Sequence, residues 1–201
     1  MKTIIFDCSD TLLHFTAKDV LAETIGDKER AYKIHNTVYS SPAWTQYDLG
    51  EISFEEMKNA ALKLLDEEDR SVADAYLDTR ADNYEIIEGM PEILSQLKSA
   101  GHKLYLISNF PDYFDKLWDR FDIFRLIDKP FVSYEHHASK GNDGRLFDIF
   151  LEKTGCKAED CVFIDDLDFL VANAIKRGMA GIVFEDPESL IRELRKLNVN
   201  I

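Results

Sequence analysis

Acidic side chains stand at the ends of two apolar runs in this sequence. Asp7 follows "TIIF", and Asp165 and Asp166 follow "CVFI". Short apolar runs without polar alternation are typical of strands that are buried on both faces of a parallel sheet. The carboxyl ends of parallel strands share one edge of the sheet, and ligands bind in the crevice there. We therefore expect Asp7, Asp165 and Asp166 to meet at that edge, although they lie far apart in the chain.

Three neighbouring carboxylates repel one another unless a cation lies between them. Mg²⁺ is a hard cation that is usually held by one or two carboxylates together with water and phosphate oxygens. The acidic cluster therefore predicts a Mg²⁺ site. The alternative for each aspartate taken singly is that it caps the helix that follows it.

A phosphate group fits the same edge of the predicted sheet. The run "LYLI" ends in Ser108 and Asn109, which offer a hydroxyl, an amide and backbone N–H groups at a strand-to-helix turn. Lys140 precedes Gly141 in a turn-rich segment ahead of a helical pattern, where its ammonium group can reach the carboxylates. Taken alone, Lys140 is better explained as a solvated loop lysine.

The elements that must position these residues alternate regularly in the second half of the chain. Strand candidates lie at residues 3–6, 104–107, 131–132, 161–164 and 181–184. Helical patterns lie at residues 92–100, 145–154, 169–177 and 187–197, several of them followed by glycine. This alternation predicts an α/β fold with a parallel sheet and right-handed crossovers.

Residues 15–88 depart from this alternation. They contain helical patterns at residues 17–25, 28–38, 54–65 and 71–83 and no convincing strand. We therefore predict two parts: a core of residues 1–14 and 89–201, and a helical segment of residues 15–88 that is inserted after the first strand.

The charge of the chain limits its partners. Its 201 residues carry 24 basic and 38 acidic side chains, for a net charge of -14. Such a protein is poorly suited to nucleic acid or to an anionic membrane surface, since both are bound mainly through Lys and Arg. No apolar stretch has the length of a membrane span, and the N-terminus does not resemble a signal peptide. The three cysteines, Cys8, Cys156 and Cys161, suggest reduced thiols and a cytoplasmic location.

Four motifs in this order resemble those of the haloacid dehalogenase (HAD) superfamily. They are "FDCSDTLL", "LISN", Lys140, and "FIDD" with "NAIKRGM". The resemblance covers the whole chain and implies a Rossmann-like three-layer core with a small α-helical cap at residues 15–88. The segment "SPAWTQYDLGEISFEE" is similar to the cap of a branch that includes sugar-1-phosphate phosphatases and the phosphatase-like domain of epoxide hydrolases.

The resemblance implies a Mg²⁺-dependent phosphatase that acts on a small phosphorylated metabolite through an aspartyl-phosphate intermediate. Asp7 is then the nucleophile, and Lys140 balances charge around it. Ser108, the backbone of Asn109, Ser9 and Asp10 are placed at the phosphate. Asp7, Asp165, Asp166 and the main-chain oxygen of Ser9 are placed at Mg²⁺.

The chain departs from the family pattern in its first motif, which is usually Asp-x-Asp-Gly-Thr. Ser9 replaces the second aspartate and Asp10 replaces the glycine. In the family, the second aspartate protonates the leaving alcohol, and general acid–base help of this kind is worth about 10²–10⁴-fold in rate. A serine hydroxyl is not acidic enough near neutral pH to replace it.

Several explanations of this departure are open. The leaving group can be one that needs little protonation, such as that of an anomeric or acyl phosphate. Asp10 can supply the proton, or the protein is a catalytically impaired relative that binds a ligand. A carbon–halide hydrolase is a further alternative, but dehalogenases of the family usually carry an aromatic residue in place of Ser9 and keep the glycine. The sequence does not identify the substrate or the oligomeric state, and Trp44, Tyr47 and His14 are the candidate substrate contacts.

Overall fold

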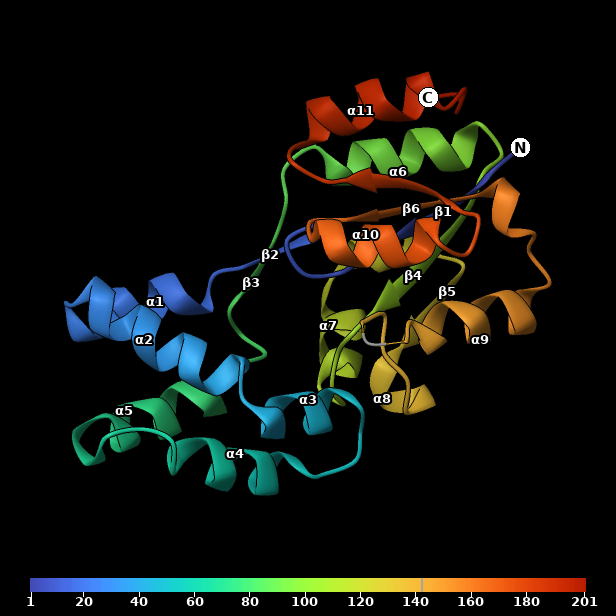
Figure 1. The fold of residues 1–201 in the computed structure, drawn as a ribbon. Helices are drawn as coiled ribbons and strands as arrows, with labels where there is room; N and C mark the ends of the chain where they lie inside the picture. Colours follow the sequence, from blue (N-terminus) through green and yellow to red (C-terminus); the bar gives the residue numbers. More distant parts are fainter. Residues whose placement is uncertain (142) are drawn as a thin grey trace.

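A five-stranded parallel sheet forms the centre of the protein (Figure 1). The computed structural model describes residues 1–141 and 143–201, and the strand order in its main sheet is β5–β4–β1–β6–β7. The strands are β1 (Thr3–Phe6), β4 (Lys103–Ser108), β5 (Lys129–Val132), β6 (Cys161–Asp165) and β7 (Ala180–Val183). Each strand overlaps one of the apolar runs, so the predicted α/β fold with a parallel sheet is confirmed.

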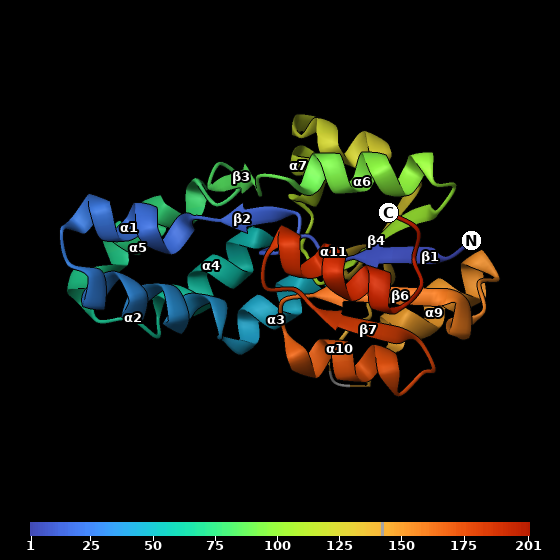
Figure 2. The same ribbon diagram turned by 90° about the horizontal axis from the view of Figure 1, so that it is seen from above.

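Helices cover both faces of this sheet, which gives three layers (Figure 2). One face carries α6 (Met90–Ser99), α7 (Phe114–Arg120) and α11 (Pro187–Lys196), and the other carries α9 (Arg145–Thr154) and α10 (Asp168–Ile175). Successive side chains of a strand point to opposite faces. Accordingly, Ile4 and Phe6 pack with residues of α6, α7 and α11, whereas Ile5 packs with residues of α9 and α10.

A block of helices stands beside this core and is joined to it by two short antiparallel strands (Figures 1 and 2). The helices are α1 (Ala17–Ile25), α2 (Lys28–Tyr39), α3 (Pro42–Asp48), α4 (Phe54–Leu62) and α5 (Glu67–Asp78). The strands are β2 (Leu13–Phe15) and β3 (Tyr84–Ile86), with Leu13 opposite Ile86. We call α1–α5 the helical block, and its division from the core at residues 14/15 and 88/89 stays a prediction.

The expectation that residues 15–88 contain no strand is wrong, because β3 lies within them. A strand of three residues is too short to show the alternation of polar and apolar residues by which strands are recognised. Further short elements were also not predicted: α3, α7, α8 (Ser133–His136), and the 3₁₀ segments Asp122–Leu126 and Ala158–Asp160.

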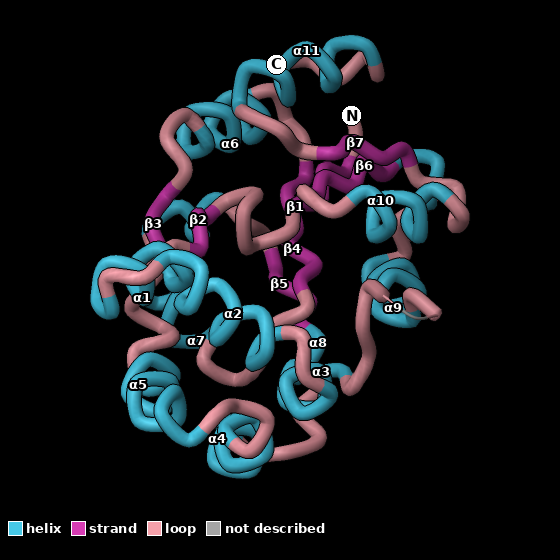
Figure 3. The backbone as a smooth tube through the Cα atoms, turned by 60° about the vertical axis from the view of Figure 1, so that its left-hand side comes forward, coloured by secondary structure: helices cyan, strands magenta, loops and turns pink. Residues whose placement is uncertain are grey.

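The start of helix α3 is nevertheless indicated by the sequence, through its N-cap residue and the proline that follows. The Ser41 side chain accepts a hydrogen bond from the Trp44 N–H, and Pro42 occupies the first turn. Serine at the N-cap followed by proline is a typical helix start. In the folded protein, α3 lies beside α8 of the core, as both Figure 1 and Figure 3 show.

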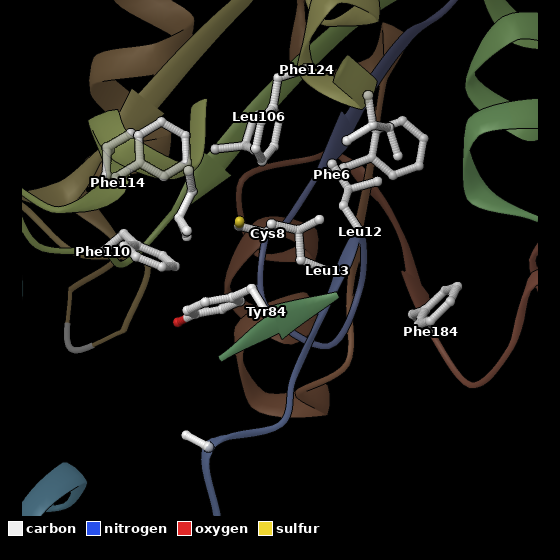
Figure 4. Packing of buried hydrophobic residues seen from close by; sticks show 14 of the residues in the cluster. Phe6, Cys8, Leu12, Leu13, Tyr84, Leu106, Phe110, Phe114, Phe124 and Phe184 are labelled. Atoms are coloured by element: carbon white, nitrogen blue, oxygen red, sulfur yellow. The ribbon is translucent and has the colours of Figure 1, made fainter. Parts of the chain in front are cut away.

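The turn after β1 is anchored in the core. Cys8, Leu12 and Leu13 are fully buried, and the N–H groups of Leu12 and Leu13 both donate to the Cys8 carbonyl at 2.9 Å. Figure 4 shows Cys8 and Leu13 close to Tyr84 and Phe110, whose rings lie 5.8 Å apart. This packing fixes the position of Ser9 and Asp10 relative to the end of β1.

None of the helices in the described part of the chain is long and apolar enough to cross a membrane. Cys8, Cys156 and Cys161 are all free thiols.

Candidate active site

Three carboxylates and a lysine meet at the carboxyl edge of the sheet. Strands β1 and β6 are neighbours, and the Asp7 N–H continues their pairing by donating to the Ile164 carbonyl at 2.9 Å. As a result, carboxylate oxygens of Asp7, Asp165 and Asp166 lie within 4.8 Å of one another. The structure therefore brings together the three aspartates that the sequence placed at this edge.

Lys140 lies between two of these carboxylates. Its Nζ is 2.7 Å from Asp7 Oδ1 and 2.6 Å from Asp165 Oδ2, and its side chain is only 1% exposed. Its backbone is fixed on both sides, since its N–H donates to Asn109 Oδ1 at 2.8 Å and its carbonyl accepts from Asn173 Nδ2 at 3.1 Å. The alternative of a solvated loop lysine does not describe this residue.

Asn109 and Asn173 thus position the lysine. The family resemblance placed the Asn109 backbone at the phosphate, which stays a prediction, and the Asn109 side-chain oxygen accepts from the Lys140 N–H. Asn173 was not predicted as a site residue, although it is the first residue of the segment "NAIKRGM" that carries part of the resemblance.

The two neighbouring aspartates at the end of β6 differ in their surroundings. Asp165 is completely buried, and it accepts hydrogen bonds from the Leu167 N–H at 2.9 Å and from Lys140 at 2.6 Å, one on each oxygen. Asp166 is partly exposed. The Asp165 carboxylate is therefore occupied in holding Lys140, whereas Asp166 is more accessible to a ligand.

Burial and mutual repulsion raise the pKa values of two carboxyl groups in this cluster. Burial raises the pKa of Asp7 to about 6, with Lys140 opposing the shift and the Asp165 charge adding to it. Burial also raises the pKa of Asp166 to about 7, and the charges of Asp7 and Asp165 add to this shift. For Lys140 the burial penalty is outweighed by Asp165 and Asp7, which raise its pKa. One ammonium group thus compensates three carboxyl groups only in part.

A divalent cation fits these residues. Asp7 Oδ1 is buried and accepts no well-directed hydrogen bond from the described residues, although the Lys140 ammonium lies nearby. A buried carboxylate oxygen that shares its neighbouring ammonium with Asp165, and that faces two further carboxyl groups, is the kind of hard oxygen ligand that Mg²⁺ prefers. Asp7 and Asp166 are the residues best placed to hold the ion.

Ser108 borders the acidic cluster, whereas the Asp10 carboxylate is engaged by hydrogen bonds elsewhere. Ser108 ends β4, is 1% exposed, and lies close enough to Asp7 to lower the pKa of that carboxyl. The Asp10 carboxylate instead accepts hydrogen bonds from His14 Nδ1 at 2.8 Å and from the Phe15 N–H at 3.2 Å. With a φ of 52°, Asp10 occupies the left-handed conformation that suits the glycine of the usual motif.

A small aromatic cavity of about 120 Å³ lies between the helical block and the core, next to Ser9. Its lining consists of Ser9, Phe15, Tyr39, Trp44, Asp48, Tyr84, Asn109, Phe110, Pro111 and Tyr113. None of these lining residues is basic. Of the candidate substrate contacts, Trp44 lines the cavity, whereas His14 borders another surface hollow. Tyr47 is turned to the core, where its hydroxyl donates to Asp112.

The stability of the metal-free protein is expected to fall as pH rises from about 5 to about 8. Asp7 and Asp166 have folded pKa values of about 6 and about 7, above the ~4 of an unfolded aspartate. The folded state therefore binds more protons than the unfolded state, and its stability is lost as pH rises through the folded values. Urea unfolding in a chelator at several pH values measures this.

Mg²⁺ is expected to reverse this loss, because it binds the ionised carboxylates. At a concentration about 100 times its dissociation constant, a ligand adds about 2.7 kcal/mol of stability. In Asp166→Asn the gain should shrink strongly. A stability in chelator that rises with pH, or that does not respond to Mg²⁺, would contradict this account of the cluster.

The fold and the site together define a class: α/β proteins with an acidic, lysine-balanced site at the carboxyl edge of a parallel sheet and a helical insertion beside it. A family model described as haloacid dehalogenase-like hydrolase matches residues 1–168. The chain belongs to this family of hydrolases, and the predicted resemblance is confirmed.

Two characterised relatives are similar to this chain. Flavin mononucleotide hydrolase 1 of the chloroplast, from Arabidopsis thaliana, is 25% identical over 158 residues, which cover 79% of this chain and 63% of the relative. Drimenol cyclase drtB from Aspergillus calidoustus is 26% identical over 202 residues, which cover 98% of this chain and 36% of that protein. The chain therefore spans less than two thirds of the length of either relative.

Solved structures share the fold. A HAD family enzyme from Bacteroides thetaiotaomicron, in complex with magnesium and inorganic phosphate, has a TM-score of 0.71 at 19% identity, covering 94% of this chain and 98% of its own. L-2-haloacid dehalogenase from Xanthobacter autotrophicus has a TM-score of 0.68 at 17% identity, covering 99% of this chain and 84% of its own. Neighbours of the same fold thus include a phosphate complex and a dehalogenase.

Proposed function

We propose that this protein is a Mg²⁺-dependent phosphatase that hydrolyses a small phosphorylated metabolite through an aspartyl-phosphate on Asp7. The observation that carries the proposal is the Asp7 carboxylate itself. It lies 2.7 Å from the Lys140 ammonium and within 4.8 Å of Asp165 and Asp166. The flavin mononucleotide hydrolase among the relatives, which is named for a phosphate ester, supports this choice.

In the proposed reaction, an Asp7 oxygen attacks phosphorus, and the bond from phosphorus to the leaving oxygen breaks. Lys140 stabilises negative charge that passes between Asp7 and the phosphoryl oxygens, and the Ser108 hydroxyl donates to one of these oxygens. Mg²⁺, held by Asp7, Asp166 and the Ser9 carbonyl, would supply a Lewis acid for the phosphoryl oxygens. Water then attacks phosphorus, which releases phosphate and restores Asp7.

The cavity limits the leaving group. A volume of about 120 Å³ is close to that of an engineered ~150 Å³ cavity that binds benzene, so it admits roughly one six-membered ring. A second anionic group would find no basic partner among the lining residues, and its charge would hinder the ionisation of Asp48. We propose a compact, uncharged leaving group such as a single sugar or aromatic ring.

The carbon–halide alternative finds less support in this chain. The solved dehalogenase shares the fold at 17% identity, which does not transfer its reaction. The small polar Ser9 borders the cavity where dehalogenases of the family usually carry an aromatic residue.

A substrate panel tests the proposal. With Mg²⁺, we expect kcat/KM for 4-nitrophenyl phosphate and for hexose 1-phosphates to exceed that for flavin mononucleotide and hexose bisphosphates by about 10-fold or more. A difference of this size corresponds to about 1.4 kcal/mol of transition-state binding. A preference for flavin mononucleotide would overturn the assignment of the leaving group.

Two further outcomes of the panel bear on the function itself. Absence of phosphate release from every ester would favour the catalytically impaired, ligand-binding alternative. Release of chloride from 2-chloropropionate without phosphatase activity would favour the carbon–halide hydrolase.

A further inference from the structure

A carboxyl group from the helical block shares the aromatic cavity with Ser9. Asp48, the last residue of α3, lines this cavity together with Ser9 and Asn109. It is the only acidic residue among the described lining residues. The cavity that receives the proposed leaving group therefore contains one carboxyl group able to donate a proton, although Ser9 removes the carboxyl group that the usual motif provides.

The position of Asp48 is fixed by contacts between the end of α3 and the core. The Ser133 hydroxyl donates to the Asp48 carbonyl at 2.5 Å and itself accepts from the Phe110 N–H at 2.8 Å. His137 Nδ1 lies 2.8 Å from the Leu49 carbonyl. These bonds hold Asp48 through its backbone, so its side chain is not needed to attach α3.

Gly50, two residues after Asp48, adds a close backbone contact to the core. Gly50 has a φ of +67°, and a Cβ at this position would lie 2.7 Å from the Tyr134 carbonyl. Only glycine permits this approach of the α3 corner to α8. Asp48 is thus presented at the cavity by a rigid corner, as proton transfer requires.

The surroundings of Asp48 keep its carboxyl group protonated near neutral pH. Burial raises its pKa to about 8, and the Lys140 charge and a hydrogen bond from the Trp44 side chain oppose the shift. The other titratable groups that line the cavity are Tyr39, Tyr84 and Tyr113, whose pKa values burial raises well above the ordinary value. They and Lys140 keep their protons in the range in which Asp48 titrates.

We propose that Asp48 is the proton donor to the leaving oxygen and so replaces the carboxyl group that Ser9 lacks. This inference rests on the proposed phosphatase function. As the Asp7 oxygen bonds to phosphorus and the bond to the leaving oxygen breaks, the Asp48 proton passes to that oxygen and an alcohol departs. The Asp48 carboxylate then takes a proton from the water that attacks the aspartyl-phosphate, which restores both acids and frees phosphate.

Leaving-group dependence tests this role. In Asp48→Asn, kcat/KM for an alkyl phosphate should fall by about 10²–10³-fold, because an alkoxide is a poor leaving group without protonation. For 4-nitrophenyl phosphate it should fall less than about 5-fold, because the phenolate leaves without a proton. Retained activity on the aryl ester also shows that the variant is folded. In the wild type, activity on the alkyl ester should fall above pH 8, and the variant should lack this limb.

A matched control separates proton transfer from the attachment of α3. Asp112→Ala removes the acceptor of the Tyr47 hydroxyl, which also holds α3 on the core, and should reduce activity on both esters by the same factor. The double variant Ser9→Asp with Asp48→Asn should recover activity on the alkyl ester, since it returns a carboxyl group to the usual position.

Equal losses on both esters in Asp48→Asn, or no loss on the alkyl ester, would overturn the role of Asp48 and leave the phosphatase proposal standing. If wild-type protein shows no release of 4-nitrophenol that depends on Asp7, the phosphatase proposal and this inference fall together.

Discussion

Replacing Asp7 by asparagine is expected to reduce kcat for phosphate release by about 10³–10⁶-fold, the range seen when an enzyme loses its nucleophile. Asparagine has almost the same shape as aspartate, but its amide oxygen is a far weaker nucleophile. In Asp7→Asn the aspartyl-phosphate cannot form, whatever the leaving group. Single-turnover and steady-state assays with 4-nitrophenyl phosphate measure the loss.

The fold of Asp7→Asn should be intact. The change removes one of three mutually repelling carboxyl groups, and the pKa of Asp7 is raised to about 6 by burial. Above pH 6, therefore, the metal-free variant should be at least as stable as the wild type. A loss of activity at unchanged or higher stability assigns the effect to chemistry.

Asp160→Asn is the matched control for this prediction. Asp160 is exposed and precedes β6, at the end of that strand opposite to Asp165. The same change of charge and shape there should alter kcat by less than about 2-fold, as surface substitutions generally do little. Retention of more than a tenth of wild-type kcat in Asp7→Asn would argue against Asp7 as the nucleophile.

The part of the site that was predictable from the sequence is the part set by the sheet. Asp7, Ser108 and Asp165 each stand at the carboxyl end of a buried parallel strand, so their meeting follows from the strand pattern alone. Lys140 has no such signal, and its place at the centre of the cluster came from the family resemblance.

The contacts between the helical block and the core could not be predicted from the pattern of apolar residues. Asp48 lies at the cavity because Ser133, His137 and Gly50 fix the end of α3 on α8. These contacts join residues that are distant in sequence and have no shared periodicity. The orientation of Asp10 was uncertain for a similar reason, since it depends on local bonds to His14 and Phe15 in a left-handed turn.

Asn109 illustrates a role that residue type does not specify. The resemblance placed its backbone at the phosphate, and the structure adds that its side-chain oxygen accepts from the Lys140 N–H. This second role depends on where the loop that carries Lys140 lies, and the residue type of Asn109 does not specify that.

Lys140→Met is expected to combine a large loss of activity with a loss of stability of about 3–5 kcal/mol at pH 8, the usual cost of breaking a buried ion pair. The substitution leaves Asp7 and Asp165 buried with no ammonium between them. Methionine keeps the volume of the side chain, so packing changes little. Urea unfolding in a chelator gives the free energy of unfolding.

The loss of stability in Lys140→Met should be smaller at pH 5 than at pH 8. Without the ammonium, the pKa of Asp7 rises further above its unfolded value, and the folded state takes up a proton that the unfolded state lacks. Raising the pH through the folded pKa removes this compensation. The variant should therefore lose stability with pH more steeply than the wild type.

Lys58→Met provides the comparison. Lys58 also contacts two carboxylates, with Asp74 at 2.9 Å and Asp78 at 3.0 Å, but these are 49% and 56% exposed. Water screens such a pair, so its loss should cost at most about 1 kcal/mol. If the two variants lost the same stability with the same dependence on pH, burial would not distinguish the sites, and the charge-balancing role of Lys140 in the acidic cluster would have to be abandoned. A larger, pH-dependent loss only in Lys140→Met would tie the lysine to the ionisation of Asp7, the state in which Asp7 can attack phosphorus.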